Sequence, residues 1–99
     1  MMNVYVKVTR SGRSRLVAAC DADLLGKTLK FGKITFEVRR DFYGGSLVNV
    51  REAMEIIRGA PNINLIGSII VDEALKEGLV HRQAILDISG VPHTQIIRM

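Results

Sequence analysis

The stretch NVREAMEIIRGAPNINLIGSIIVDEALKEG, residues 49–78, decides the fold class because its apolar residues are spaced as in α-helices. Four of them lie at the helical positions i, i+3, i+4 and i+7: Val50, Ala53, Met54 and Ile57. Asn49 precedes them and Glu52 follows it by three residues, which resembles a capping box. Gly59 and Pro61 then predict the end of this first helix.

A second helix is predicted later in the same stretch. It begins after Asn64, and Gly78 ends it as a residue suited to left-handed backbone. The apolar residues expected to point inward from this helix are Ile66, Ile69, Ile70 and Ala74.

Both flanks of the helical stretch show the two-residue alternation of β-strands. The predicted hairpins pair residues 4–8 with 16–19, 28–31 with 34–39, and 84–88 with 94–98, the last across a turn at 89–92. In the second hairpin one face is expected to carry Ile34, Phe36 and Val38. We therefore expect an α+β fold, with an antiparallel sheet built from hairpins and two main helices packed on it, in a single domain over residues 1–99.

The composition limits the class of protein. The chain has 99 residues, of which 47% are hydrophobic and 24% charged, as in ordinary globular domains. It holds no run of about 18 apolar residues, so we expect no membrane association. The single cysteine cannot form an internal disulfide, which agrees with a reducing compartment. These features predict a soluble, cytoplasmic protein.

The charge is distributed unevenly along the chain. Residues 1–51 hold ten Lys and Arg against four Asp and Glu, whereas residues 52–99 hold four against six. A basic half indicates a surface for a polyanion such as RNA, although such charges can also simply solvate a small sheet. The candidate phosphate-binding residues are Lys7, Arg10, Arg13, Arg15, Lys27, Lys30, Lys33, Arg39 and Arg40.

The segment RRDFYGG, residues 39–45, is the best candidate for a binding loop. Its arginines suit phosphate contacts, Tyr43 or Phe42 suits stacking on a base, and the two glycines permit close backbone approach. In the alternative interpretation Phe42 fills the core and the glycines only turn the chain. Near the C-terminus, residues 91–95 (VPHTQ) either present His93 and Gln95 to a ligand or only shape a hairpin.

The segment ACDADLLGKT, residues 19–28, contains several apparent motifs. A phosphate-binding loop is excluded, because the first glycine of that motif falls on Asp21 and Lys27 leads into a predicted strand. Asp21 is expected to cap a short helical turn that Gly26 closes. A metal site is not predicted, since the spacing of the available ligands matches no common pattern; these are Cys20, Asp21, Asp23, His81 and His93.

Cys20 is the one candidate nucleophile. A thiol just before a helical turn can have a lowered pKa, and His93 is a conceivable base. The neighbouring Asp21 and Asp23 act in the opposite direction, because negative charge raises a thiol pKa. Packing in the core is the alternative role for Cys20.

Five segments taken in order resemble the archaeal family called domain of unknown function 424 (DUF424). They are VYVKV, AACDADLLGKTL, FYGG, NLIG and GVPHTQIIR, and they span nearly the whole chain. The resemblance implies a small α+β domain, no established enzymatic activity and an association with RNA binding. The polar and glycine positions of the family pattern fall on Cys20, Asp21, Gly26, Tyr43, Gly44, Asn64, Gly67, His93 and Gln95.

Three functions follow as hypotheses. The first is a non-enzymatic RNA-binding protein connected with translation or ribonucleoproteins, with no cofactor. The second is a small enzyme that uses Cys20 and His93. The third is an assembly factor that binds an acidic protein or forms a homodimer through a sheet edge.

Overall fold

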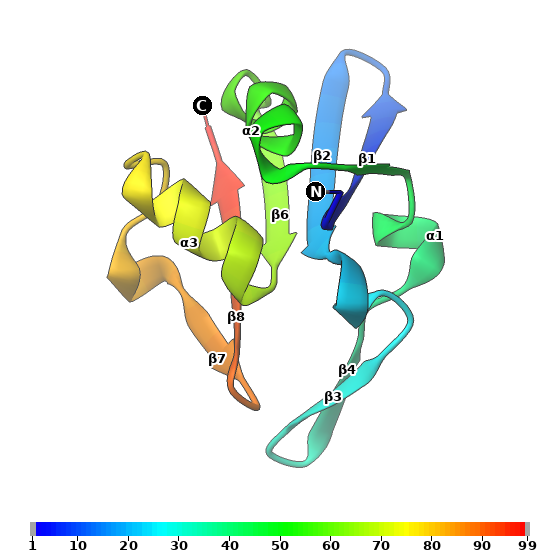
Figure 1. The fold of residues 1–99 in the computed structure, drawn as a ribbon, viewed down its shortest axis with the longest axis vertical. Helices are drawn as coiled ribbons and strands as arrows, with labels where there is room; N and C mark the ends of the chain where they lie inside the picture. Colours follow the sequence, from blue (N-terminus) through cyan, green and yellow to red (C-terminus); the bar gives the residue numbers. More distant parts are fainter. Residues whose placement is uncertain (1, 99) are drawn as a thin grey trace.

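The computed structural model describes residues 2–98, and their main feature is a six-stranded sheet with its two longer helices on one side (Figure 1). The sheet has the order β5-β1-β2-β6-β8-β7, and a separate two-stranded sheet joins β3 and β4. The strands are β1 (Val4–Ser11), β2 (Ser14–Asp21), β3 (Thr28–Phe31), β4 (Ile34–Glu37), β5 (Ser46–Val48), β6 (Asn62–Ile66), β7 (Leu86–Ile88) and β8 (Val91–Ile97). The helices are α1 (Arg40–Tyr43), α2 (Val50–Arg58) and α3 (Ser68–Lys76), with short 3-10 turns at Ala22–Leu24 and Arg82–Ala84.

The sheet is mixed, which corrects the expectation of an antiparallel one. All its neighbouring strands run antiparallel except β2 and β6, which are parallel. A parallel pair requires a long crossover connection, and here the chain between β2 and β6 contains α2. The three predicted hairpins are present as β1–β2, β3–β4 and β7–β8.

Strand β6 was not predicted, and it lies near the middle of the sheet. Its residues Asn62–Ile66 fall where the second helix was expected to begin. A short apolar run does not distinguish a strand from a buried helix by its spacing alone. Gly67, with φ of +118°, separates β6 from α3, so Ile66 is buried from a strand and not from a helix.

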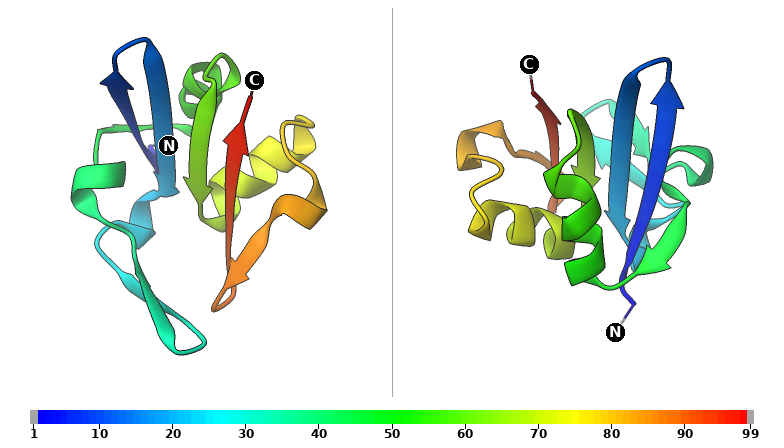
Figure 2. Two further views of the ribbon diagram at one scale, coloured as in Figure 1. Left: turned by 180° about the vertical axis from the view of Figure 1, so that it is seen from behind. Right: turned by 90° about the horizontal axis from the view of Figure 1, so that it is seen from above.

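The two longer helices cover one face of the sheet (Figure 2, right). The strand residues on this face are almost entirely buried, and they include Val4, Val6, Val17, Ile63 and Leu65. Helix α2 begins as predicted, with the Asn49 side chain accepting a hydrogen bond from the Glu52 N–H at 2.8 Å. Helix α3 buries Ile70 and Ala74 as expected, whereas Ile69 is 39% exposed.

The opposite face of the sheet meets α1 and the β3–β4 hairpin instead (Figure 2, left). A smaller apolar cluster lies here, built from Ala18, Cys20, Val38, Tyr43 and Ile66. We call this side the open face, because no long helix covers it. The strand predicted over residues 34–39 ends at Glu37, and Ile34 at the hairpin tip is 66% exposed, not packed beside Val38.

Two further details of the chain differ from the sequence predictions. The last turn is shorter than expected, because Val91 and Pro92 already belong to β8. Helix α1 and strand β5 were not predicted, since each is only three or four residues long. No helix within residues 2–98 is long and apolar enough to cross a lipid bilayer.

Candidate functional site

The polar residues of the open face are aligned by strand register. Lys7, Ala18, Asn64 and Gln95 are successive partners across β1, β2, β6 and β8. In a second row, Tyr5, Cys20, Ile66 and His93 are partners across the same strands. Because alternate residues of a strand share a face, both rows point to the side of α1.

Tyr43, Asn64 and His93 converge at the centre of this face. The Tyr43 hydroxyl donates a hydrogen bond of 2.5 Å to Asn64 Oδ1, and His93 Nε2 lies 3.3 Å from the same oxygen. An amide oxygen only accepts, so this contact assigns the proton of neutral His93 to Nε2. Burial lowers the pKa of His93 and raises that of Tyr43, which keeps both groups neutral near pH 7.

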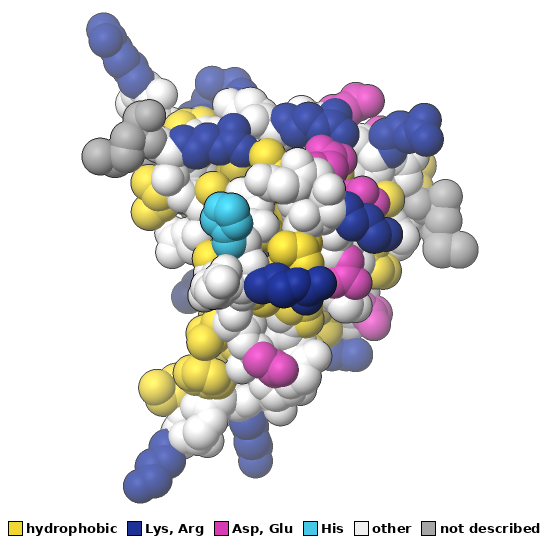
Figure 3. All heavy atoms as spheres, turned by 90° about the vertical axis from the view of Figure 1, so that its left-hand side faces the viewer, with side chains coloured by type: hydrophobic (Ala, Val, Ile, Leu, Met, Phe, Trp, Pro, Cys, Tyr) yellow, Lys and Arg dark blue, Asp and Glu magenta, His cyan; other side chains and the backbone are white. Residues whose placement is uncertain are grey.

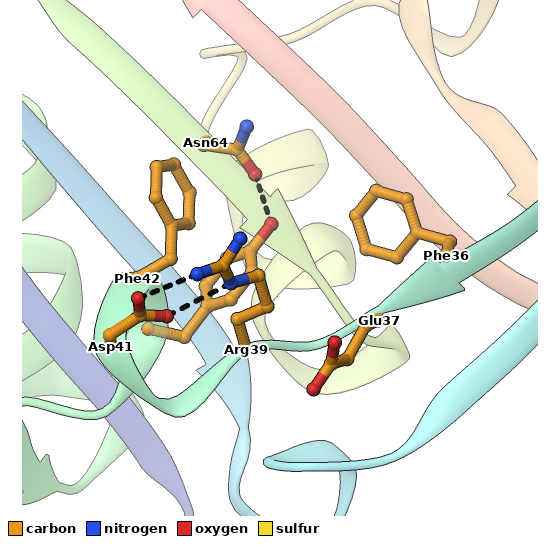
Figure 4. Close-up of a pocket in the computed structure, with 7 residues that line it drawn as sticks. Phe36, Glu37, Arg39, Asp41, Phe42 and Asn64 are labelled. Carbon is orange, nitrogen blue, oxygen red and sulfur yellow. Dashed lines mark hydrogen bonds and ion pairs between the residues drawn. The ribbon is translucent and has the colours of Figure 1, made fainter.

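A cleft of about 440 Å³ lies beside this group of residues. It is lined by Phe36, Glu37, Arg39, Asp41, Phe42, Tyr43 and Asn64. In Figure 4, Phe42 and Phe36 lie on opposite sides of the cleft, with Asn64 between them at one end. The Phe36 ring also packs against the His93 imidazole at a centroid distance of 5.2 Å, and Phe42 meets Tyr43 edge to face at 4.8 Å.

An exposed ion pair lies at the cleft. Arg39 donates two hydrogen bonds to the carboxylate of Asp41, at 3.1 and 2.8 Å (Figure 4). This contact lowers the pKa of Asp41 and raises that of Arg39, mainly through the hydrogen bonds between the two side chains. Both side chains are more than 60% exposed, so water screens the pair and a ligand can displace it at small energetic cost.

A second hollow, of about 400 Å³, adjoins the cleft. It shares Glu37, Arg39 and Asp41 with the cleft and adds Gly26 and Arg40. Gly26 has φ of +84°, and a Cβ there would lie 3.3 Å from the Arg40 guanidinium. Glycine at this position therefore leaves room for Arg40 beside the hollow.

Cys20 lies on the open face but beneath its surface. Its side chain is fully buried, and burial raises its pKa to about 12, with smaller contributions from Asp21 and Asp23. A thiol in this state is protonated at neutral pH, and it does not line the cleft. The geometry is that of a packed core residue.

Asp21 points to the other face of the sheet and caps a different helix from the one expected. Its carboxylate accepts hydrogen bonds from the N–H groups of Ile69 and Ile70, at 2.9 and 3.1 Å, at the start of α3. It makes no side-chain cap to the turn Ala22–Leu24. Sequence reasoning assigned Asp21 to the adjacent turn because it could not foresee that β2 ends next to α3.

Five of the nine family-pattern positions fall into two groups. Tyr43, Asn64 and His93 meet beside the cleft, whereas Gln95 is exposed on the strand next to Asn64 and lines neither this cleft nor the second hollow. Gly67 belongs instead with Asp21, because a Cβ on Gly67 would lie 2.2 Å from the Asp21 carboxyl carbon. The first group forms a surface site, and the second group holds α3 against β2.

The basic residues expected to contact phosphate do not form one patch. Arg10 and Arg13 are exposed at the end of the β1–β2 hairpin, with Arg15 half-buried behind them. Lys30 and Lys33 are exposed on the β3–β4 hairpin, and Lys27 is exposed just before it. In Figure 3 basic side chains project at the lower end of the molecule, where Figure 1 has this hairpin, next to hydrophobic side chains.

Three of the predicted basic residues lie at the site itself. Arg39 and Arg40 line the hollows, and Lys7 donates a hydrogen bond of 2.5 Å to the backbone carbonyl of Asp41. Sequence reasoning did not identify Phe36, Glu37 or Asp41 as part of the site. Asp41 lies within the segment at residues 39–45, and that segment was singled out as a binding loop. Phe36 was expected only to lie on one face of a hairpin.

Metal ligands do not cluster among residues 2–98. No group of three or more His, Cys, Asp or Glu side chains in this part of the chain could hold a metal ion. His81 is exposed at the edge of the Arg82–Ala84 turn, while His93 contacts Asn64 and Phe36.

Comparison with known proteins identifies the family. Residues 8–99 match the model of the family described as "Protein of unknown function (DUF424)", and the chain belongs to this family. A crystal structure of an uncharacterized conserved protein from Methanopyrus kandleri is similar, with a TM-score of 0.83 and 29% sequence identity. That similarity covers 98% of this chain and 94% of the other. No curated protein matches the chain significantly.

Proposed function

We propose that this protein binds single-stranded RNA through the open face, without enzymatic activity, as part of translation or of a ribonucleoprotein. The observation that carries the proposal is the aromatic cleft next to Arg39, Arg40 and Lys7. Single-stranded RNA is bound by aromatic rings that stack on bases and by cations that contact phosphates. Both kinds of group occur here within one site.

The stacking role belongs to Phe42 and not to Tyr43. Tyr43 is only 2% exposed, and its hydroxyl is held by Asn64, so its ring cannot receive a base. Phe42 is partly exposed and lines the cleft. Tyr43 then has the role of positioning the Asn64 amide.

The carboxylates of Glu37 and Asp41 count against phosphate binding at the cleft, because they repel an anion. Asp41 is neutralised by Arg39. The ends of the β1–β2 and β3–β4 hairpins carry further exposed basic side chains, and these suit phosphates further along the strand.

A salt titration tests the proposal. The affinity for a short, labelled, mixed-sequence RNA is measured by fluorescence anisotropy at about 50 mM and about 200 mM KCl. We expect binding that weakens steeply with salt, because released counterions contribute most of the affinity. Absence of binding at the lower salt concentration would contradict RNA binding.

A pair of matched variants locates the basic surface. Arg10→Gln with Arg13→Gln removes two exposed charges at the β1–β2 end, and the slope of log affinity against log salt should become shallower by about 1.4. The control, Lys76→Gln with Arg82→Gln, removes two exposed charges elsewhere and should leave the slope unchanged. An equal change of the slope in the two double variants would indicate that the RNA is attracted by the net charge of the protein and not by this surface.

One observation favours a protein partner as a second candidate. At the tip of the β3–β4 hairpin, Phe31 and Ile34 are 40% and 66% exposed beside Lys33, which suits contact with an acidic protein or with a second copy of this chain. Affinity purification from a native lysate, with and without nuclease, separates the two candidates. Partners that survive nuclease treatment would favour protein contacts over RNA.

A further inference from the structure

The two adjoining hollows differ in character. The cleft has aromatic rings on two sides and the Asn64 amide at one end, whereas the second hollow is polar and has Arg39 and Arg40 in its wall. Glu37, Arg39 and Asp41 belong to both hollows, so the two are continuous. An occupant that fits both needs a planar ring and an anionic group, as a nucleotide has.

The hydrogen bonds of Asn64 restrict which base fits the cleft. Its Oδ1 already accepts from the Tyr43 hydroxyl and lies within reach of the His93 Nε2–H, so both acceptor positions of this oxygen are engaged. The amide nitrogen makes no hydrogen bond to another residue between 2 and 98. Figure 4 shows this nitrogen turned away from the hydrogen bond with Tyr43.

A free asparagine recognises adenine with both ends of its amide, because adenine presents a donor beside an acceptor. Asn64 offers only its donor end, so it cannot form this pair. The ring nitrogens of adenine also accept from such a donor, but N1 and N7 each lie beside the adenine amino group, which then faces the occupied oxygen without a partner. A carbonyl oxygen on the base, as in uracil, accepts from the donor without bringing a second donor against that oxygen.

We infer that the two hollows form a subsite for one nucleotide of the bound RNA, in which Asn64 selects a base with a carbonyl oxygen over adenine and Arg39 with Arg40 holds the phosphate. This inference rests on the proposed RNA binding and adds base selection to it. Phe42 stacks on the base, while Tyr43 and His93 act as positioning residues that fix the orientation of the amide.

The choice of base is tested with oligouridine and oligoadenosine of equal length at low salt. We expect uridine to bind about fivefold more tightly, which corresponds to one hydrogen bond. Asn64→Asp retains an acceptor for Tyr43 and His93 but removes the donor, so the preference for uridine should disappear. The control is Gln95→Glu, the same amide-to-acid change on the cross-strand partner of Asn64, and it should retain the preference.

The ring and the cation are tested separately. Phe42→Leu keeps an apolar side chain without the aromatic face, and both RNAs should bind about tenfold more weakly. Arg40→Gln should weaken both RNAs while leaving their ratio unchanged, because a phosphate contact carries no base information. Unfolding curves of each variant show whether the fold is retained.

The outcomes separate this inference from RNA binding itself. Equal affinity for uridine and adenosine, or the same ratio in Asn64→Asp and in Gln95→Glu, overturns the base selection but leaves RNA binding in place. Failure of the unmodified protein to bind either RNA at low salt overturns both.

Discussion

The two faces of the central sheet differ in the side chains that line them and in the elements that cover them. The face under α2 and α3 is lined by fully buried aliphatic side chains such as Ile63 and Leu65. The open face carries Asn64 between these two residues in the same strand, with a short helix and a hairpin at its margin. A single strand thus contributes alternately to the core and to the site. The larger apolar core thus lies on one face, whereas the candidate site lies on the other.

The largest effect is expected from truncating the helix-covered face. Leu65→Ala removes a fully buried side chain and leaves a cavity, so the free energy of unfolding should fall by roughly 2 to 5 kcal/mol. Urea unfolding followed by circular dichroism measures this change. Gln95→Ala, on the exposed part of the open face, should change it by less than about 0.5 kcal/mol. Similar losses in both variants would contradict the division between the faces.

The junction between the sheet and α3 should be nearly as sensitive. In Gly67→Ala the new Cβ meets the Asp21 carboxylate, which caps α3, and the backbone has φ of +118°. We expect a loss of about 3 kcal/mol from backbone strain and weakened capping. Gly12→Ala is the matched control, because Gly12 also has positive φ but nothing within 4 Å of a Cβ. It should cost about 1 kcal/mol in the same unfolding experiment.

A smaller effect is expected from the hydrogen bond of the open face. Tyr43→Phe keeps the ring but removes the donor to Asn64, so stability should fall by about 1 kcal/mol. The preference for uridine should also decrease, since Asn64 then has a free acceptor and can rotate. Tyr5→Phe, on the same face, serves as the control and should change neither quantity measurably. A stable Tyr43→Phe protein with unchanged base preference would indicate that Tyr43 does not position the amide.

The smallest effect is a pH dependence from His93. Burial lowers the pKa of His93 below its ordinary value of 6.5, so the folded state binds fewer protons than the unfolded chain. The stability that neutral His93 provides is complete above pH 6.5 and is lost as the pH falls through the lowered pKa. The free energy of unfolding should therefore be lower at about pH 5.5 than at about pH 7.5, and this difference should be smaller in His93→Gln. The control His81→Gln, at an exposed position, should show the same difference between the two pH values as the unmodified protein.

Local patterns predicted the elements that are long or chemically marked. Helix α2 begins at the Asn49 cap, and the β1–β2 hairpin follows the alternation around Val4 and Val6. Strand β6 was missed because five residues with mixed polarity resemble the start of a helix as much as a strand. Asn62 and Asn64 face the open side, and Ile63 between them faces the core, as in a half-polar strand. The apolar residues that follow this short alternation are spaced as in a helix, and they obscured it.

The residues that line the cleft were also singled out only in part. The segment at residues 39–45 was singled out, and Arg39, Phe42 and Tyr43 from it do line the cleft. The roles within the segment were not predictable, because burial of Tyr43 depends on its contact with Asn64, 21 residues away. Phe36 joins the site only because the β3–β4 hairpin folds back towards His93.

The sequence by itself determined the mixture of helices and hairpins, the basic N-terminal half and the family, because these depend on local spacing, composition and ordered motifs. Only the tertiary structure decided that β2 and β6 are parallel, that Asp21 caps α3, and that Asn64 is held between Tyr43 and His93. Each of these three arrangements includes a contact between residues at least 29 positions apart in the sequence. Such contacts form only when the whole chain packs, so no local pattern in the sequence predicts them.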